Sequence, residues 1–202
     1  MDRPVRAFDV ARYILRHAGP MTTMKLQKLV YYAQAWSLAW DGVPLFSDPI
    51  EAWQHGPVVR SLFESHRGRR WIRDSEGSGT ALSSDQQDTV DAVLERYGSL
   101  TAEVLSELPH AETPWSAARQ ANDTAVVEWE ALRRYYQAVL ADVLAEGQDD
   151  PTLATEAPRF WLKSLLSRVT PDTIHDEWDT GQPQGREVWR ALTCRTPATS
   201  SG

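Results

Sequence analysis

The stretch from Thr22 to Arg60 constrains the fold of this chain more than any other segment. Its first half repeats apolar residues at the i, i+3, i+4 and i+7 spacing of one helical face, and its second half carries prolines that interrupt any further helix. The apolar positions are Leu26, Leu29, Val30, Ala33, Trp36 and Trp40. We therefore expect a helix from Thr22 to about Trp40, then a short extended segment, and a turn at His55-Gly56-Pro57.

A second face of the same helix carries Lys25, Lys28 and Tyr32. We expect this face to be exposed, and two interpretations stay open for it: together with Tyr31 it lines a partner pocket, or it is a solvated helix flank. For His55, next to Trp53 and a Gly-Pro pair, we favour a buried hydrogen-bonding brace over an exposed imidazole.

Helical periodicity also marks the segments on both sides of this stretch. A first helix is expected from Phe8 to Ala18, and a long one from Thr124 to Ala145. Helix starts between them are predicted at a Ser84/Gln87 capping box, at Thr101, and at Thr113 with a proline at the first helical position. The predicted fold class is mainly α: a compact helical domain with a small extended or β-hairpin element, plus a C-terminal extension.

Charge and cysteine content exclude several classes of function. The net charge is −7, the histidines are scattered, and the one cysteine, Cys194, has no partner for an internal disulfide. The sequence has no catalytic motif, nucleotide-binding fingerprint or metal-ligand spacing, and no stretch of about 18 apolar residues. We therefore expect no enzymatic activity, no cofactor and no metal, no membrane partner, and a cytoplasmic location.

An arginine group follows the Gly-Pro turn. Arg67, Arg69, Arg70 and Arg73 surround Trp71, a combination that suits phosphates and a stacked base. The acidic balance of the whole chain opposes this use. We favour the interpretation of a solvated hairpin, which makes nucleic acid an unlikely partner.

The chain divides into three regions by composition. Residues 5–146 carry the helical domain, 147–158 form an acidic and proline-bearing linker, and 159–202 hold a short amphipathic segment and a polar tail. The tail residues predicted to bind a partner are Ile174, Trp178, Arg186 and Trp189. Spaced tryptophans among acidic residues suit a segment that folds on a basic partner surface.

Three separated motifs resemble the Panacea domain, the SocA/GepA-like antitoxin family. They are Leu26-Gln27-Lys28-Leu29 with Tyr31-Tyr32, Ala52-Trp53-x-His55-Gly56-Pro57-Val58, and Thr113-Pro114-Trp115 with the preceding Leu108 to Glu112. The resemblance covers roughly residues 5 to 145. It implies a mainly helical domain with a small extended element, and an antitoxin that binds an unrelated toxin encoded next door, without catalysis.

The resemblance also selects the candidate site residues. The residues that carry the domain signature or bind the partner are Lys25, Gln27, Lys28, Tyr31, Tyr32, Trp53, His55, Gly56, Pro57, Pro114 and Trp115. The predicted function is neutralisation of a cognate protein toxin by direct binding, through the domain surface, the tail or both. Two alternatives stay open: an adaptor that delivers a toxin to a protease, as one relative does, and a nucleic-acid-binding autoregulator.

Overall fold

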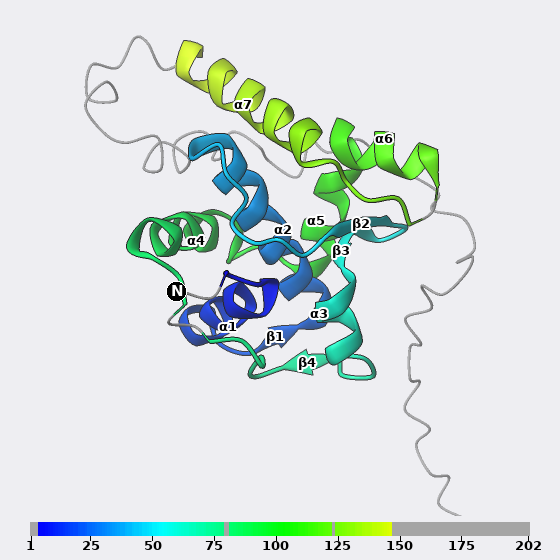
Figure 1. Cartoon of the computed structure of the whole chain (residues 1–202). Helices are drawn as coiled ribbons and strands as arrows, with labels where there is room; N and C mark the ends of the chain where they lie inside the picture. The colour runs from blue at the N-terminus through cyan, green and yellow to red at the C-terminus, as the bar shows by residue number, and fades with distance from the viewer. Residues whose placement is uncertain (1–3, 79–80, 123, 147–202) are drawn as a thin grey trace, which may run out of the picture.

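The computed structural model describes residues 4–78, 81–122 and 124–146, and its centre is the long helix α2 (Thr23–Trp40). Five of the other helices of the described domain pack against α2, and the remaining two pack on those helices and on a pair of strands (Figure 1). These other helices are α1 (Ala7–Ala18), α3 (Arg60–Ser65), α4 (Ser84–Tyr97), α5 (Ala102–Glu107), the 3-10 helix η1 (Leu108–Ala111), α6 (Thr113–Ala121) and α7 (Trp129–Glu146). The mainly helical prediction is confirmed.

Helix α2 is buried on nearly all sides, from Thr23 to Ala39. The expectation of an exposed second face is therefore wrong: Lys28 and Tyr32 are each 1% exposed. Of the three residues on that face, Lys25, in the first turn, is the one that reaches partly into solvent. A helix surrounded by neighbours has no solvent face, so its polar residues need partners inside the protein.

Most of the predicted helix boundaries are confirmed, with two corrections at the caps. The hydroxyls of Thr22 and Thr101 cap α2 and α5. The capping box of α4 is formed by Ser83 and Gln86 and not by the Ser84/Gln87 pair, because two pairs of the same spacing lie one residue apart. Thr113 is the first residue of α6 and not its cap, which is Glu112.

Two strands form an antiparallel hairpin beside α2. Strand β2 (Ile50–Trp53) pairs with β3 (Gly56–Val59), and residues 54–55 make the turn. The turn predicted at His55-Gly56-Pro57 is therefore placed too late in the chain, since Gly56 and Pro57 already belong to β3.

The other edge of β2 is covered by a short extended segment before α7. Ala52 N donates to Ala125 O and Val127 N to Ile50 O, each over 2.8 Å. This pairing keeps the segment after Thr124 extended, so α7 begins at Trp129 and not at Thr124 as predicted.

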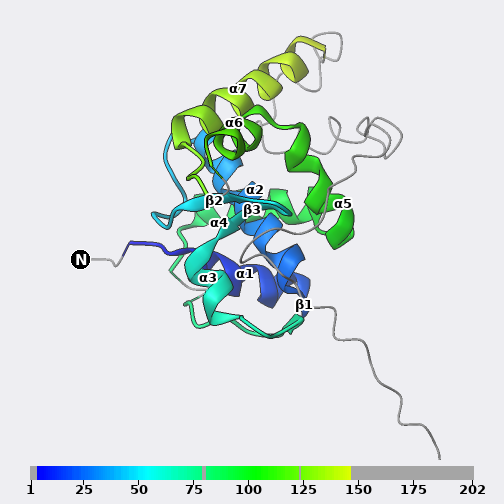
Figure 2. The same ribbon diagram turned by 90° about the vertical axis from the view of Figure 1, so that its right-hand side faces the viewer.

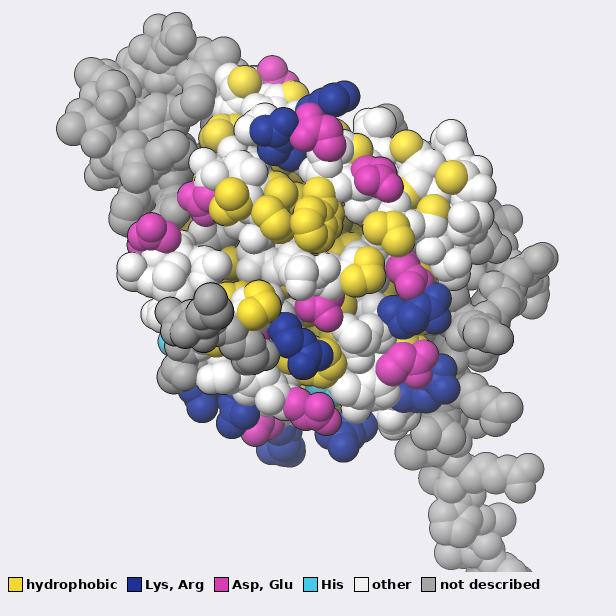
Figure 3. Space-filling view, in the orientation of Figure 1, with side chains coloured by type: hydrophobic (Ala, Val, Ile, Leu, Met, Phe, Trp, Pro, Cys, Tyr) yellow, Lys and Arg dark blue, Asp and Glu magenta, His cyan; other side chains and the backbone are white. Residues whose placement is uncertain are grey.

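The two ends of the domain differ in structure and charge. Helices α6 and α7 lie at one end, and the ladder of β1 (Met21–Thr22) and β4 (Trp71–Ile72) lies at the other (Figures 1 and 2). The arginine segment thus pairs with β1 through Trp71 and Ile72 and not with itself as a hairpin. Residues 66–70 and 73–78 form turns and loop, which was the other expectation for this segment. Lys and Arg side chains gather along this lower edge (Figure 3).

The predicted linker and the tail residues Ile174, Trp178, Arg186 and Trp189 lie outside the described residues. Within the described part, none of the helices has the length and hydropathy that a membrane span requires.

Candidate functional site

The β2–β3 hairpin is held through its own main chain. Backbone carbonyls along it accept hydrogen bonds from side chains on α2, α5, η1 and α6. The donors are Arg119 Nη1 (3.2 Å to Ala52), Trp115 Nε1 (3.2 Å to Trp53), His110 Nε2 (2.9 Å to Gln54), Ser106 Oγ (2.9 Å to His55) and Lys28 Nζ (3.0 Å to Pro57). We call these five donors the hairpin clamp. Because each carbonyl has its own donor, the clamp fixes where the turn lies.

Lys28 and Gly56 fit together at the centre of the clamp. Gly56 has a φ of 91°, a conformation that favours glycine. A Cβ atom at this position would lie 2.7 Å from Lys28 Nζ. The glycine therefore provides both the backbone conformation of β3 and the space for the buried ammonium.

Gln27 holds the far end of the same strand. Its amide nitrogen donates to Val59 O over 3.3 Å, and its amide oxygen accepts from Val59 N over 2.9 Å. This paired contact satisfies both backbone groups of Val59 at the edge of β3. Two neighbouring residues of α2 thus hydrogen-bond to the same strand at two positions: Gln27 to Val59 and Lys28 to Pro57.

Beneath the clamp lies a buried carboxylate. Glu112, between η1 and α6, is 6% exposed and accepts hydrogen bonds from the hydroxyls of Tyr31, Tyr32 and Tyr136. We call these four residues the glutamate–tyrosine cluster. Burial raises the pKa of Glu112 to about 7, against the opposing effect of the hydroxyl donors and Lys28. The cluster joins α2, α7 and the start of α6.

This raised pKa predicts an unusual pH dependence of stability. Between the ordinary pKa of 4.5 and the folded value of about 7, the folded protein holds a proton that the unfolded chain has released. Stability then falls as pH rises across this window, by about 3 kcal/mol at 1.36 kcal/mol per pKa unit. Urea unfolding of the wild type and of Glu112→Gln at pH 4.5 and pH 8 measures this difference. Parallel pH profiles for the two proteins would contradict it.

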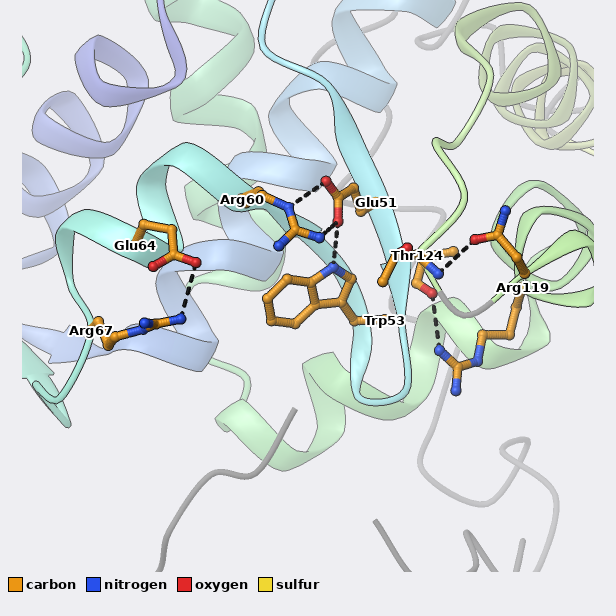
Figure 4. Close-up of polar contacts among 9 residues, drawn as sticks. Glu51, Trp53, Arg60, Glu64, Arg67, Arg119 and Thr124 are labelled. Carbon is orange, nitrogen blue, oxygen red and sulfur yellow. Dashed lines mark hydrogen bonds and ion pairs between the residues drawn. The ribbon is translucent and has the colours of Figure 1, made fainter. Parts of the chain in front are cut away.

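The outer face of the hairpin carries a separate polar group. The Arg60 guanidinium donates to both carboxylate oxygens of Glu51, over 2.7 and 2.6 Å, and Trp53 Nε1 donates to the same carboxylate over 2.8 Å (Figure 4). These contacts raise the pKa of Arg60. Since Trp53 is 4% exposed, its indole packs against the domain and is not displayed.

The structure brings most of the predicted site residues together and separates one. Those around the hairpin and the cluster are Gln27, Lys28, Tyr31, Tyr32, Trp53, His55, Gly56, Pro57, Pro114 and Trp115. Lys25 lies apart, where its Nζ donates to Gly98 O over 2.6 Å and partial burial lowers its pKa. The buried imidazole brace predicted at His55 is not found there, because His55 is only half-buried. Its backbone carbonyl accepts from Ser106 Oγ, and the imidazole that braces the turn belongs to His110, which donates to Gln54 O.

Sequence reasoning missed several members of the site. These are Ser106, His110, Glu112, Arg119 and Tyr136. Glu112 was quoted only as part of a motif, and its place directly before Thr113-Pro114-Trp115 was the one available signal. Tyr136 follows the helical period of its own segment, which predicts a packing residue but not the acceptor of its hydroxyl. Ser106, His110 and Arg119 reach the hairpin from three different elements, so the periodicity of any one segment does not relate them. Among the described residues, no group of three or more His, Cys, Asp or Glu side chains is placed to hold a metal ion.

Comparison with known proteins gives two matches. A family model described as "Antitoxin SocA-like, Panacea domain" matches residues 26–116, a range that encloses the hairpin, Lys28 and Glu112. A protein named "Antitoxin SocA", from Caulobacter vibrioides (strain NA1000 / CB15N), is 30% identical over 129 residues, which cover 55% of this chain and 69% of that protein. No solved structure gives a significant match.

Proposed function

Since the chain belongs to the SocA-like antitoxin family defined by the Panacea domain, we propose that it neutralises a cognate protein toxin by direct protein–protein binding. The toxin would be encoded in the neighbouring gene. The observation that carries this proposal is the match to Antitoxin SocA across more than two thirds of that protein. The proposal assigns the chain no catalytic step.

The hairpin clamp supports a scaffolding role for the family motifs. Lys28 and Trp115 direct their polar atoms to hairpin carbonyls, and Tyr31 and Tyr32 direct theirs to Glu112. Polar groups whose hydrogen-bond partners lie inside the protein stabilise one arrangement of the fold and are not available to a partner protein. We infer that these residues shape the domain, while the toxin contacts surfaces that the domain supports.

The direct test is co-expression with each neighbouring gene. Growth should be lost when the toxin gene is expressed alone and restored when this chain is present. A purified mixture should then show toxin inhibition together with a stable complex on size-exclusion chromatography. If none of the neighbouring genes is toxic, or if a toxic one is not neutralised, the proposed function is wrong.

A second measurement separates neutralisation from delivery to a protease. Under the proposal, the purified toxin loses activity on mixing, and its half-life in cells does not shorten. An adaptor would produce the reverse pattern, with an active toxin in the mixture and a shorter half-life in a pulse-chase experiment. The two outcomes are exclusive for any one toxin.

For the tail, we propose that residues 159–202 provide most of the toxin specificity. Truncation after Ala157, or Trp178→Ala together with Trp189→Ala, is expected to weaken binding at least thirtyfold, since a Trp anchor contributes on the order of 2 kcal/mol. The matched control is Trp71→Ala, which removes an exposed tryptophan of the helical domain outside residues 159–202. Titration calorimetry measures the affinity, and circular dichroism checks that the helical domain stays folded. Full neutralisation by the truncated protein would move the binding surface to the domain.

A further inference from the structure

The end of the domain opposite α7 carries a basic surface built around an exposed indole. Trp71 is 60% exposed, although most large apolar side chains of the described domain are buried. Arg67, Arg69, Arg70 and Arg73 surround it in sequence, and all four are exposed. We call these five residues the arginine edge. At the end of the domain where the β1–β4 ladder lies, Lys and Arg side chains gather along the lower edge of Figure 3, with Asp and Glu side chains among them.

The backbone of the arginine edge is anchored to the domain. Trp71 and Ile72 pair with Thr22 and Met21, and Ile72 is 1% exposed. Thr23 adds two hydrogen bonds, from its N to Arg70 O over 3.1 Å and from its hydroxyl to Arg69 O over 2.6 Å. The exposed side chains are therefore displayed from a main chain of defined position. This is more order than the solvated hairpin expected from the sequence.

Most of the guanidinium groups on the edge are available. Arg67 forms an ion pair with Glu64 over 3.1 Å. Within the described ranges, the guanidinium groups of Arg69, Arg70 and Arg73 have no hydrogen bond or ion pair. The adjacent carboxylate of Asp74 is already engaged by Arg12 over 3.5 Å.

A basic hollow lies directly beyond the edge. It has a volume of about 530 Å³, and Arg6, Arg12 and Arg16 line it together with Glu76. The segment after Arg73 joins the two sites. This segment is fixed along α1 by hydrogen bonds from Ser75 Oγ to Phe8 O, from Ser78 N to Asp9 Oδ1 and from Arg12 Nη1 to Gly77 O, of 3.3, 2.6 and 2.8 Å. A segment of defined position therefore links the edge to the hollow, and it carries the exposed side chains of Asp74 and Glu76.

We propose that this surface binds single-stranded nucleic acid, as an activity separate from toxin binding. An exposed indole provides a stacking face for an unpaired base, and the flanking guanidinium groups provide forks for the phosphates on each side. The hollow has the volume of sites that take ligands of nucleotide size, and its arginines would continue the backbone path. A duplex would not fit this chemistry as well, because its bases are already stacked.

An acidic protein partner fits the same surface less well. Protein interfaces centre on an apolar core in which aromatic anchors are surrounded by groups that exclude water. Trp71 instead has arginines as its neighbours in sequence. A protein that removed water from these guanidinium groups would have to provide a carboxylate for each of them. The phosphates of a flexible single strand can pair with these guanidinium groups while the groups stay hydrated.

The test is fluorescence anisotropy of the full-length protein with labelled 12-nucleotide oligothymidylate and oligouridylate. No toxin is present, so the result does not depend on the proposed antitoxin function. Trp71→Ala is expected to weaken binding about tenfold, within the range for loss of one stacked base. Replacing Arg69, Arg70 and Arg73 with alanine should reduce the slope of log K against log salt by about 2, at about 0.7 per phosphate contact.

Controls distinguish this site from general attraction to polyanions. Arg133→Ala with Arg134→Ala removes one half-buried and one exposed cation from α7, both paired with Glu130, and should leave the affinity within twofold. Trp71→Phe keeps a stacking face and should retain most of the binding, and thermal unfolding of each variant checks the fold. Two results would overturn the proposal: no binding at 100 μM protein in low salt, or equal affinity for a polyglutamate of matched charge with no effect of Trp71→Ala.

Discussion

Leucine in place of Glu112 is expected to lower the free energy of unfolding by about 4 kcal/mol. The substitution removes the shared acceptor of the Tyr31, Tyr32 and Tyr136 hydroxyls. A buried polar group left without a partner costs about 1–3 kcal/mol. Removing a carboxylate that burial disfavours offsets part of this loss. For a domain of this size, the melting temperature should fall by about 10 °C.

The effect of Glu112→Leu can be assigned to the hydroxyl groups by a double-mutant cycle. Tyr136→Phe in the wild type should cost about 1 kcal/mol, since it removes one hydrogen bond to the carboxylate. In the Glu112→Leu background the same change should be neutral or stabilising, because it then removes an unpaired hydroxyl. Urea unfolding at pH 8, where Glu112 with its pKa of about 7 is mainly ionised, measures all four proteins. Equal effects of Tyr136→Phe in both backgrounds would mean that the cluster does not act as a unit.

The sequence was sufficient to predict the helices, because their apolar spacing and caps are local properties. The Thr22 and Thr101 caps and the extent of α2 illustrate this. The start of α7 was placed at Thr124, although the helical period itself begins at Trp129. Nothing in residues 124–128 alone shows that β2 pairs with this segment in the fold. The pairing of β2 with the segment before α7 joins residues about 75 positions apart, and it produces no periodic pattern in the sequence of either segment.

The candidate site was predictable in its residues but not in its arrangement. Lys28 and Tyr32 were placed on a water-facing surface because a charged or hydroxylated residue in a helix usually faces solvent. In the structure their polar atoms reach Pro57 O and the Glu112 carboxylate. The acceptor that a buried lysine or tyrosine reaches is set by tertiary packing, which the local sequence does not show. The family resemblance identified these residues as important, and the contacts supply the physical reason.

Gly56→Ala is expected to lower the free energy of unfolding by about 3 kcal/mol, from two separate causes. The positive φ of Gly56 disfavours any L residue by about 1–2 kcal/mol. The new methyl group would also meet Lys28 Nζ at 2.7 Å and Cε at 3.0 Å. Lys28 is 1% exposed, so it cannot swing into solvent, and moving it would break its hydrogen bond to Pro57 O.

Gly42→Ala separates these two causes, because Gly42 also has a positive φ, of 70°, but has open space around its Cα. It should therefore cost only the backbone part, about 1 kcal/mol. Lys28→Leu removes the Cε and Nζ atoms that the methyl group would meet, so Gly56→Ala in that background should cost about as much as Gly42→Ala. Chemical unfolding of the four single and double variants gives the coupling energy. If Gly56→Ala and Gly42→Ala cost the same in the wild type, Lys28 is free to move, and the hairpin clamp does not depend on the fit between lysine and glycine.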